Sequence, residues 1–235
     1  MPAGLPHPHI SIGMLLFPDL TQLDLTGPYE IFARMPNTTV VLVAETREPV
    51  RSEHGLTITP DSTLDGAPPM DVIFVPGGAG INRMMEYQPA LEFLQKCARD
   101  AQYVTAVCTG SLLLGAAGLL KGYRATTHWL SLDLLVAFGA QPVQARVVRD
   151  RNRITGGGIT AGMDFGLALA AELCGDSVAK EIQLMLEYDP QPPFQTGSPD
   201  SASPDLVQKV RLARKPIQDD RRAIVERAAT RMRQS

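Results

Sequence analysis

The sequence predicts a three-layer α/β sandwich, in which helices cover both faces of a largely parallel central sheet. Short apolar segments rich in β-branched residues alternate along the chain with helical segments, which is the order of such a fold. Several of the apolar segments are nearly continuous, as expected of strands buried on both faces. With 235 residues, 44% of them hydrophobic, the chain can bury one sizeable core.

The predicted strands are apolar and β-branched, and turn residues follow most of them. In chain order they are His9–Phe17, Val40–Ala44, Asp71–Val75, Tyr103–Val107, Val143–Arg149 and Arg153–Thr155. A hairpin is expected over Val50–Thr59, where His54-Gly55 is the turn signal. The last two strands are expected to pair around the turn Asp150-Arg151-Asn152.

The predicted helices follow the strands. The first is expected to start near Gly27-Pro28, because Gly suits the cap and Pro the first helical position. Gly139 and Gly175 are expected to end two of the later helices. These later helices are Pro89–Ala101, Gly110–Gly118, Ser131–Phe138, Thr160–Cys174 and Ser177–Leu186.

The composition divides the chain into four segments. Residues 1–8 are predicted to be a disordered arm, 9–188 the α/β domain, and 189–204 a strap rich in Pro and Ser. Residues 205–235 are predicted to form a basic helix that packs on the domain or on a dimer partner. From Lys209 onward this segment has nine Lys and Arg against three Asp and Glu. We interpret these charged side chains as exposed to solvent.

Charge and cysteine content limit the classes of partner and compartment. The formal net charge of −3 does not suggest nucleic acid or a membrane surface as the main partner. The longest apolar run, Leu112–Leu120, is about half the length of a membrane-spanning helix. Three scattered cysteines form neither a disulfide framework nor the paired spacing of a zinc site. No phosphate-binding or dinucleotide motif is present. We therefore expect a cytoplasmic protein without metal or cofactor.

Cys108 occupies the sharpest predicted turn of the chain. The buried strand Tyr103–Val107 runs directly into it, and the helix Gly110–Gly118 follows without a linker. Such a turn presents a side chain at the carboxyl edge of the sheet, where open α/β sheets bind ligands. The helix amino terminus places N–H groups and positive dipole beside the sulfur, which favours the thiolate. We predict that Cys108 is a nucleophile, whereas Cys97 and Cys174 are interpreted as buried apolar residues.

Asp24 is the candidate for exchanging protons with Cys108. It is expected in the loop after the first strand, at the same edge of the sheet. In the turn Pro76-Gly77-Gly78, the backbone N–H of Gly78 is expected to stabilise a developing negative charge.

Further residues are expected around the pocket. His128 is interpreted with equal weight as a base for Cys108 or as a structural histidine, and Trp129, the only tryptophan, as a core residue or a pocket wall. The residues predicted to line the pocket are Gly77, His128, Trp129, Gly157 and Ile159.

Taken together, these segments resemble a known family. The stretches LLFPDLTQLDLTGPYEIF, DVIFVPGG, VCTGSLLLGAAGLL, ATTHW and TGGGITAGMDF, in this order and spacing, are similar to the ThiJ/PfpI superfamily and, within it, to the isocyanide (isonitrile) hydratases. The resemblance runs from about Ile10 to Leu186. It implies a flavodoxin-like sandwich of the kind also found in class I glutamine amidotransferases.

Two positions carry the resemblance to the hydratases. Many members of the superfamily have a glutamate in the loop after the first strand and a histidine directly after the cysteine, whereas this chain has Asp24 and Thr109. By motif position, the resemblance implies Cys108 as nucleophile, Asp24 as acid and base, and Thr109 as a supporting hydroxyl that holds the acid and the sulfur in register. It also implies a homodimer, no metal, and an isocyanide substrate hydrated through a thioimidate on the cysteine.

Other interpretations of the same cysteine remain open. Glyoxalase, deglycase or peptidase chemistry occurs in the superfamily, and the absence of histidine after Cys108 argues mainly against the peptidase. Similar domains are fused to helix-turn-helix regions in transcriptional regulators, which makes ligand sensing an alternative. A redox sensor would also need an exposed thiol of low pKa.

Overall fold

The computed structural model describes residues 7–234. Its central feature is a 7-stranded sheet in the order β10-β11-β7-β6-β1-β2-β5. The strands are β1 (Ile10–Leu15), β2 (Thr38–Ala44), β5 (Ser62–Thr63), β6 (Val72–Val75), β7 (Tyr103–Val107), β10 (Val147–Asp150) and β11 (Arg153–Gly156). Adjacent strands are parallel except for β10, which is antiparallel to β11.

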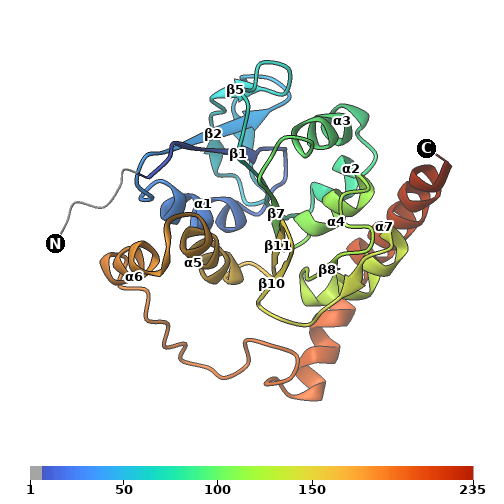
Figure 1. Ribbon diagram of the computed structural model, residues 1–235. Helices are drawn as coiled ribbons and strands as arrows, with labels where there is room; N and C mark the ends of the chain where they lie inside the picture. Colours follow the sequence, from blue (N-terminus) through green and yellow to red (C-terminus); the bar gives the residue numbers. More distant parts are fainter. Residues whose placement is uncertain (1–6, 235) are drawn as a thin grey trace.

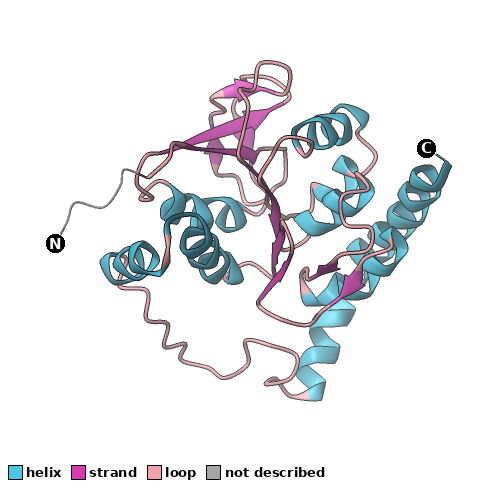
Figure 2. Cartoon of the chain, in the orientation of Figure 1, coloured by secondary structure: helices cyan, strands magenta, loops and turns pink. Residues whose placement is uncertain are grey.

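Helices lie on both sides of this sheet (Figures 1 and 2). One side carries α1 (Gln22–Phe32), α5 (Ala161–Cys174) and α6 (Asp176–Met185). The other side carries α2 (Ile81–Met84), α3 (Gln88–Cys97), α4 (Gly110–Ala116), the 3₁₀ helix η1 (Trp129–Phe138) and α7 (Pro204–Gln234). The predicted three-layer sandwich around a largely parallel sheet is confirmed.

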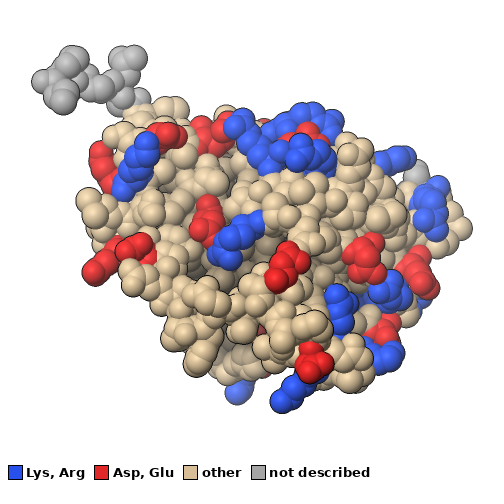
Figure 3. Space-filling model, turned by 90° about the horizontal axis from the view of Figure 1, so that it is seen from below, with Lys and Arg blue, Asp and Glu red and all other residues tan. Residues whose placement is uncertain are grey.

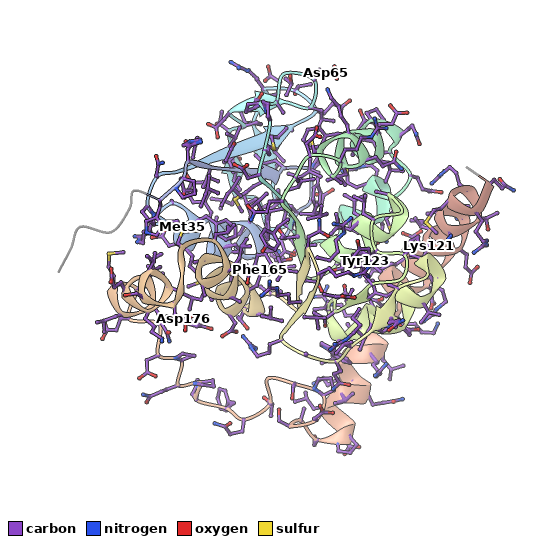
Figure 4. All side chains as sticks on the ribbon, viewed as in Figure 1. Met35, Asp65, Lys121, Tyr123, Phe165 and Asp176 are labelled. Carbon is purple, nitrogen blue, oxygen red and sulfur yellow. The ribbon has the colours of Figure 1, made fainter. Side chains whose placement is uncertain are left out.

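An aromatic cluster joins the sheet to the first of these helical layers. Phe74 on β6 packs against Phe32 of α1 and Phe165 of α5, with ring centroids 6.0 and 5.5 Å away. Phe165 lies in the interior of the molecule (Figure 4). All three side chains are fully buried. Edge-to-face and tilted contacts of this kind stabilise a core beyond the area that they bury.

Two short two-stranded sheets, one antiparallel and one parallel, lie outside the central one. β3 (Val50–Arg51) and β4 (Thr57–Ile58) pair in antiparallel fashion, with Gly55 at a φ of 93° in the turn between them, so the predicted hairpin is confirmed. β8 (Arg124–Ala125) pairs with β9 (Gln141–Pro142). On the face seen in Figure 3, acidic and basic side chains both occur over most of the surface.

The first helix begins earlier than predicted. It starts at Gln22, and Pro28 lies inside it, so the expected start near Gly27-Pro28 is wrong. The backbone of Thr21 fixes the start, because its N–H donates to Gly77 O and its carbonyl accepts from Asp24 N. Asp24 therefore lies in the first turn of a helix rather than in a loop.

The strand predicted over Val143–Arg149 is also shorter than expected. Only Val147–Asp150 pairs with β11. Before that, Val143 N donates to Ala125 O and Ala145 O accepts from Thr126 Oγ1. These contacts with the β8 region hold residues 143–146 in an irregular path. The helix predicted over Ser131–Phe138 is confirmed as the 3₁₀ helix η1, which ends at Gly139.

The end of the chain folds back over the domain. α7 runs along η1, α4 and α2 and buries Arg221, Ile224, Val225, Ala228 and Ala229. The predicted arm, residues 1–8, lies largely outside the described residues. A long connection that includes the strap, residues 189–204, links α6 to α7 along the lower edge of Figure 1. No helix among residues 7–234 is long and apolar enough to cross a membrane.

Gly110 provides a test of how closely α4 must approach the sheet. A Cβ at Gly110 would lie 2.3 Å from Val75 O and 2.7 Å from Pro76 O, both rigid backbone atoms. We expect Gly110→Ala to lower the free energy of unfolding by about 2 kcal/mol despite the better helix propensity of Ala, measured by urea denaturation. Gly197→Ala, where a Cβ has no neighbour within 4 Å, serves as control. Equal stability of the two variants would contradict this account of the packing.

Candidate active site

Cys108 forms a strained turn between β7 and α4. Its φ is 52°, a left-handed conformation that non-glycine residues adopt at a cost. Hydrogen bonds to both backbone groups of Cys108 hold the turn. Cys108 N donates to Gly156 O (3.0 Å) and Gly157 O (2.9 Å), and Cys108 O accepts from Thr127 Oγ1 (2.6 Å). The side chain is therefore fixed at the carboxyl edge of the sheet.

Asp24 lies beside this turn and is completely buried. Its Oδ2 accepts the backbone N–H of Gly77 at 3.1 Å, whereas its Oδ1 has no hydrogen-bond partner among the described residues. Gly77 separates the two side chains: a Cβ there would lie 2.7 Å from Asp24 Oδ2 and 2.8 Å from Cys108 Cβ. Only glycine leaves room for the carboxyl and the cysteine to meet.

Burial controls the protonation of both groups. Desolvation raises the pKa of Asp24 to about 7, although its interactions with the Cys108 thiol and the Gly77 N–H act in the opposite direction. Burial also raises the pKa of the Cys108 thiol well above its usual value, and the neighbouring Asp24 raises it further. Above the pKa of Asp24, the pair therefore holds one proton, on the sulfur, and below that pKa Asp24 is protonated as well.

This result corrects the expected thiolate. The backbone N–H groups of Thr109 and Ile159 do interact with the sulfur and lower its pKa. However, burial and the Asp24 carboxyl outweigh them. The helix terminus favours the thiolate as predicted, but it does not determine the resting state of Cys108.

Thr109 and Gly78 are bound to each other rather than to the reacting pair. The Thr109 hydroxyl accepts the Gly78 N–H at 3.0 Å and contacts Gly78 O at 3.2 Å. This geometry contradicts two expectations. The Gly78 N–H is not free to stabilise a negative charge, and the Thr109 hydroxyl does not bridge Asp24 and Cys108.

A cavity of about 130 Å³ opens onto Cys108. Of the residues predicted to surround the pocket, His128 and Ile159 line this cavity. Trp129 and Gly157 line a larger adjacent one, and Gly77 is packed between Asp24 and Cys108. Glu53, from the β3–β4 hairpin, also lines the cavity and accepts the Thr21 hydroxyl at 2.8 Å.

His128 is a neutral residue of this site. Burial, together with Arg221 and Arg214, lowers its pKa to about 4. Its Nδ1 accepts the backbone N–H of Leu130 at 3.3 Å, so the neutral ring carries its proton on Nε2. Such a ring is a poor base near neutral pH, which favours the structural interpretation of His128 over its role as a base for Cys108.

Arg221 is the main residue that sequence reasoning missed. It comes from α7 and is only 4% exposed, although the basic segment was interpreted as solvated charge. Its guanidinium donates to Asn82 Oδ1 (2.8 Å), Ser131 Oγ (3.2 Å) and Gly78 O (3.4 Å). No carboxylate of the described residues forms an ion pair with it.

A buried cation without a counter-ion is costly, and here it lines the cavity of Cys108. Burial lowers the pKa of Arg221, whereas the negative charges of Cys108, Asp220 and Glu53 raise it, so a thiolate at Cys108 and the guanidinium stabilise each other. The sequence signal was weak: Arg221 is the charged residue that precedes the apolar positions Ile224, Val225, Ala228 and Ala229 at helical spacing.

Residues 7–234 contain no group of three or more His, Cys, Asp or Glu side chains placed to hold a metal ion.

Comparisons with known proteins identify relatives of the whole chain. Residues 10–172 match the DJ-1/PfpI family. The chain is 53% identical to an isonitrile hydratase from Pseudomonas putida over 223 residues, covering 95% of this chain and 98% of that protein. A crystal structure of a ThiJ/PfpI family protein from Pseudomonas syringae superimposes with a TM-score of 0.91 at 42% identity, covering 96% and 97% of the two chains.

A transcriptional regulator is also related. The HTH-type regulator GbdR from Pseudomonas aeruginosa is 37% identical over 189 residues, which cover 76% of this chain and 51% of the regulator.

The raised pKa of Asp24 makes stability depend on pH. The folded protein holds this proton more tightly than the unfolded chain, so the contribution of Asp24 to the free energy of unfolding falls as pH rises from 3.8 to about 7. The fall is on the order of 4 kcal/mol. We expect Asp24→Asn to be more stable than wild type at about pH 8 and to lose this advantage near pH 4, measured by urea denaturation. If the stability difference between Asp24→Asn and wild type is the same at both pH values, the raised pKa of Asp24 is contradicted.

Removing the charge of Arg221 should raise the pKa of His128. We expect Arg221→Met to raise that pKa from about 4 toward its ordinary value, only in part because burial remains. NMR titration of the imidazole signals measures it, with His128→Gln to assign the resonance. Arg222→Met is the matched control, because Arg222 is exposed on the same helix and pairs with Asp133. An unchanged pKa in Arg221→Met would show that Arg221 does not face the cavity in solution.

Proposed function

The chain belongs to the DJ-1/PfpI family, and we propose that it hydrates isocyanides to N-substituted formamides, with Cys108 as nucleophile and Asp24 as proton carrier. The observation that carries this proposal is the placement of one buried carboxyl, Asp24, beside one buried thiol, Cys108, with only Gly77 between them. The 53% identity to an isonitrile hydratase supports the substrate class.

The first step adds the thiol across the terminal carbon of the isocyanide. The sulfur of Cys108 forms a bond to that carbon, and the proton shared with Asp24 moves to the same carbon. The product is a thioimidate, R–N=CH–S–Cys108, and Asp24 is left as a carboxylate. A carbon of this kind accepts both a nucleophile and a proton, so one acid and one nucleophile suffice.

The second step adds water to the thioimidate. The Asp24 carboxylate takes a proton from water while the water oxygen bonds to the carbon, and the proton passes on to nitrogen. Collapse of the resulting R–NH–CH(OH)–S–Cys108 breaks the carbon–sulfur bond. It releases R–NH–CHO and returns one proton to the pair. The sum is isocyanide plus water to formamide.

Fixed charges around the cavity support these steps. The N–H groups of Thr109 and Ile159 interact with the sulfur, and the buried Arg221 lies on the cavity wall. All three stabilise negative charge on sulfur when the proton leaves it. Burial and, to a lesser extent, Glu53 raise the pKa of Asp24, which makes its carboxylate a stronger acceptor for the thiol proton.

The expected homodimer and cytoplasmic location stay predictions, as does the division of the chain at residues 9–188, 189–204 and 205–235.

Turnover of a simple isocyanide tests the proposal. Wild-type protein should convert methyl isocyanide to N-methylformamide, detected by NMR, whereas Cys108→Ala should be inactive. Asp24→Asn should lose at least about a hundredfold in kcat/KM. Methylglyoxal is offered in parallel, and turnover of methylglyoxal alone would contradict the proposal.

The pH profile tests the shared proton. Below the pKa of Asp24, about 7, the carboxyl takes up a second proton, and the thiol can no longer transfer its own. We therefore expect kcat/KM for methyl isocyanide to rise with pH through about 7 and then level off. A profile that falls through neutral pH would exclude Asp24 as the acceptor of the thiol proton.

A further inference from the structure

A second cavity, of about 390 Å³, lies next to the cavity of Cys108. His128 and Ile159 line both cavities, so the two cavities adjoin at these residues. Because an isocyanide R–N≡C is linear, a molecule whose terminal carbon meets the sulfur directs its substituent R away from Cys108. The neighbouring cavity offers room for a substituent that passes beside these two residues.

The walls of this second cavity are suited to hydrocarbon. Trp129, Leu132, Ile159, Ala145, Ala161 and Pro199 contribute apolar surface. Two hydroxyls in the wall are already engaged: Thr126 Oγ1 donates to Ala145 O at 3.0 Å, and Thr127 Oγ1 donates to Cys108 O at 2.6 Å. They therefore gain nothing by turning toward a polar ligand.

The charged side chains at the cavity also have partners. Arg146 donates from Nε to Asp164 at 2.6 Å, and Asp200 accepts from Gln144 Nε2 at 2.7 Å. A charged substituent would have to compete with these contacts. The cavity thus selects an uncharged group.

The strap forms one wall of the cavity. Residues 197–200 line it, in the connection that runs from α6 to α7 in Figure 1. The bond between Gln144 and Asp200 ties this part of the strap to the segment before β10. The strap is therefore placed to enclose a ligand in this cavity.

We propose that this cavity binds the N-substituent of the isocyanide and selects bulky, uncharged hydrocarbon substituents, such as benzyl, over methyl. The inference rests on the proposed function, because it assigns the part of the substrate that does not react. It makes the strap and Trp129 specificity-determining elements, while the chemistry stays at Cys108 and Asp24.

The test is the ratio of kcat/KM for benzyl isocyanide to kcat/KM for methyl isocyanide. This ratio does not depend on the fraction of correctly folded enzyme. Wild type should favour the benzyl compound. Leu132→Phe, which fills the cavity, and Gln144→Ala, which frees the strap, should each lower the ratio about tenfold.

A matched control lies in the same connection. Gln191 donates to Asp189 at 3.3 Å away from the cavity, and Gln191→Ala should keep the wild-type ratio. An unchanged ratio in both Leu132→Phe and Gln144→Ala would overturn the inference even if methyl isocyanide is a good substrate. A similar drop in Gln191→Ala would overturn the specific role of the Asp200 contact.

Binding can be measured without turnover, because Trp129 is the only tryptophan. N-benzylformamide should change its fluorescence in wild type at concentrations where N-methylformamide does not, and Leu132→Phe should weaken this response. If neither isocyanide is hydrated, the proposed function fails, and this titration decides about the cavity alone. Equal fluorescence responses to the two formamides would then contradict the proposed preference of the cavity for bulky hydrocarbon groups.

Discussion

The burial of the Asp24 carboxyl against the Cys108 thiol is the constraint on which the rest of the site depends. A carboxyl with no exposure and one oxygen without a partner is unfavourable as an anion. Its carboxylate is therefore a stronger proton acceptor than that of a solvated aspartate. The proposed chemistry needs such an acceptor, because the thiol proton must leave sulfur and reach the isocyanide carbon as that carbon bonds to sulfur.

The surrounding structure is arranged to maintain this contact. The strained φ of Cys108 is fixed by three backbone-directed hydrogen bonds, and Gly77 leaves the two side chains in contact. The resemblance suggested Thr109 as a direct participant, and the glycine turn suggested Gly78. In the structure, these two residues instead bind each other. Rigid support of this kind positions a reacting pair without touching the substrate.

The segments after the α/β domain contribute to the site as well. Arg221 of α7 lies outside residues 10–172, which match the DJ-1/PfpI family, but the similarity to the Pseudomonas putida isonitrile hydratase covers 95% of the chain and so extends into α7. The last helix thus brings a buried cation to the cavity of Cys108, and the strap that leads to this helix lines the neighbouring cavity.

The sequence by itself determined the sandwich, most of its strands and the reactive turn, because period, apolar runs and turn residues are local signals. It also placed Asp24 and Cys108 at one edge of the sheet. Only the tertiary structure decided that Asp24 begins a helix, that His128 is neutral and that Arg221 is buried. Each of these depends on groups distant in the chain. The carbonyl of Gly77 fixes the start of the helix, and burial with Arg221 and Arg214 lowers the pKa of His128. Asn82 and Ser131 accept hydrogen bonds from the Arg221 guanidinium. The protonation of Cys108 followed the same rule, since desolvation is a property of the packed interior and not of the strand, turn and helix that present the sulfur.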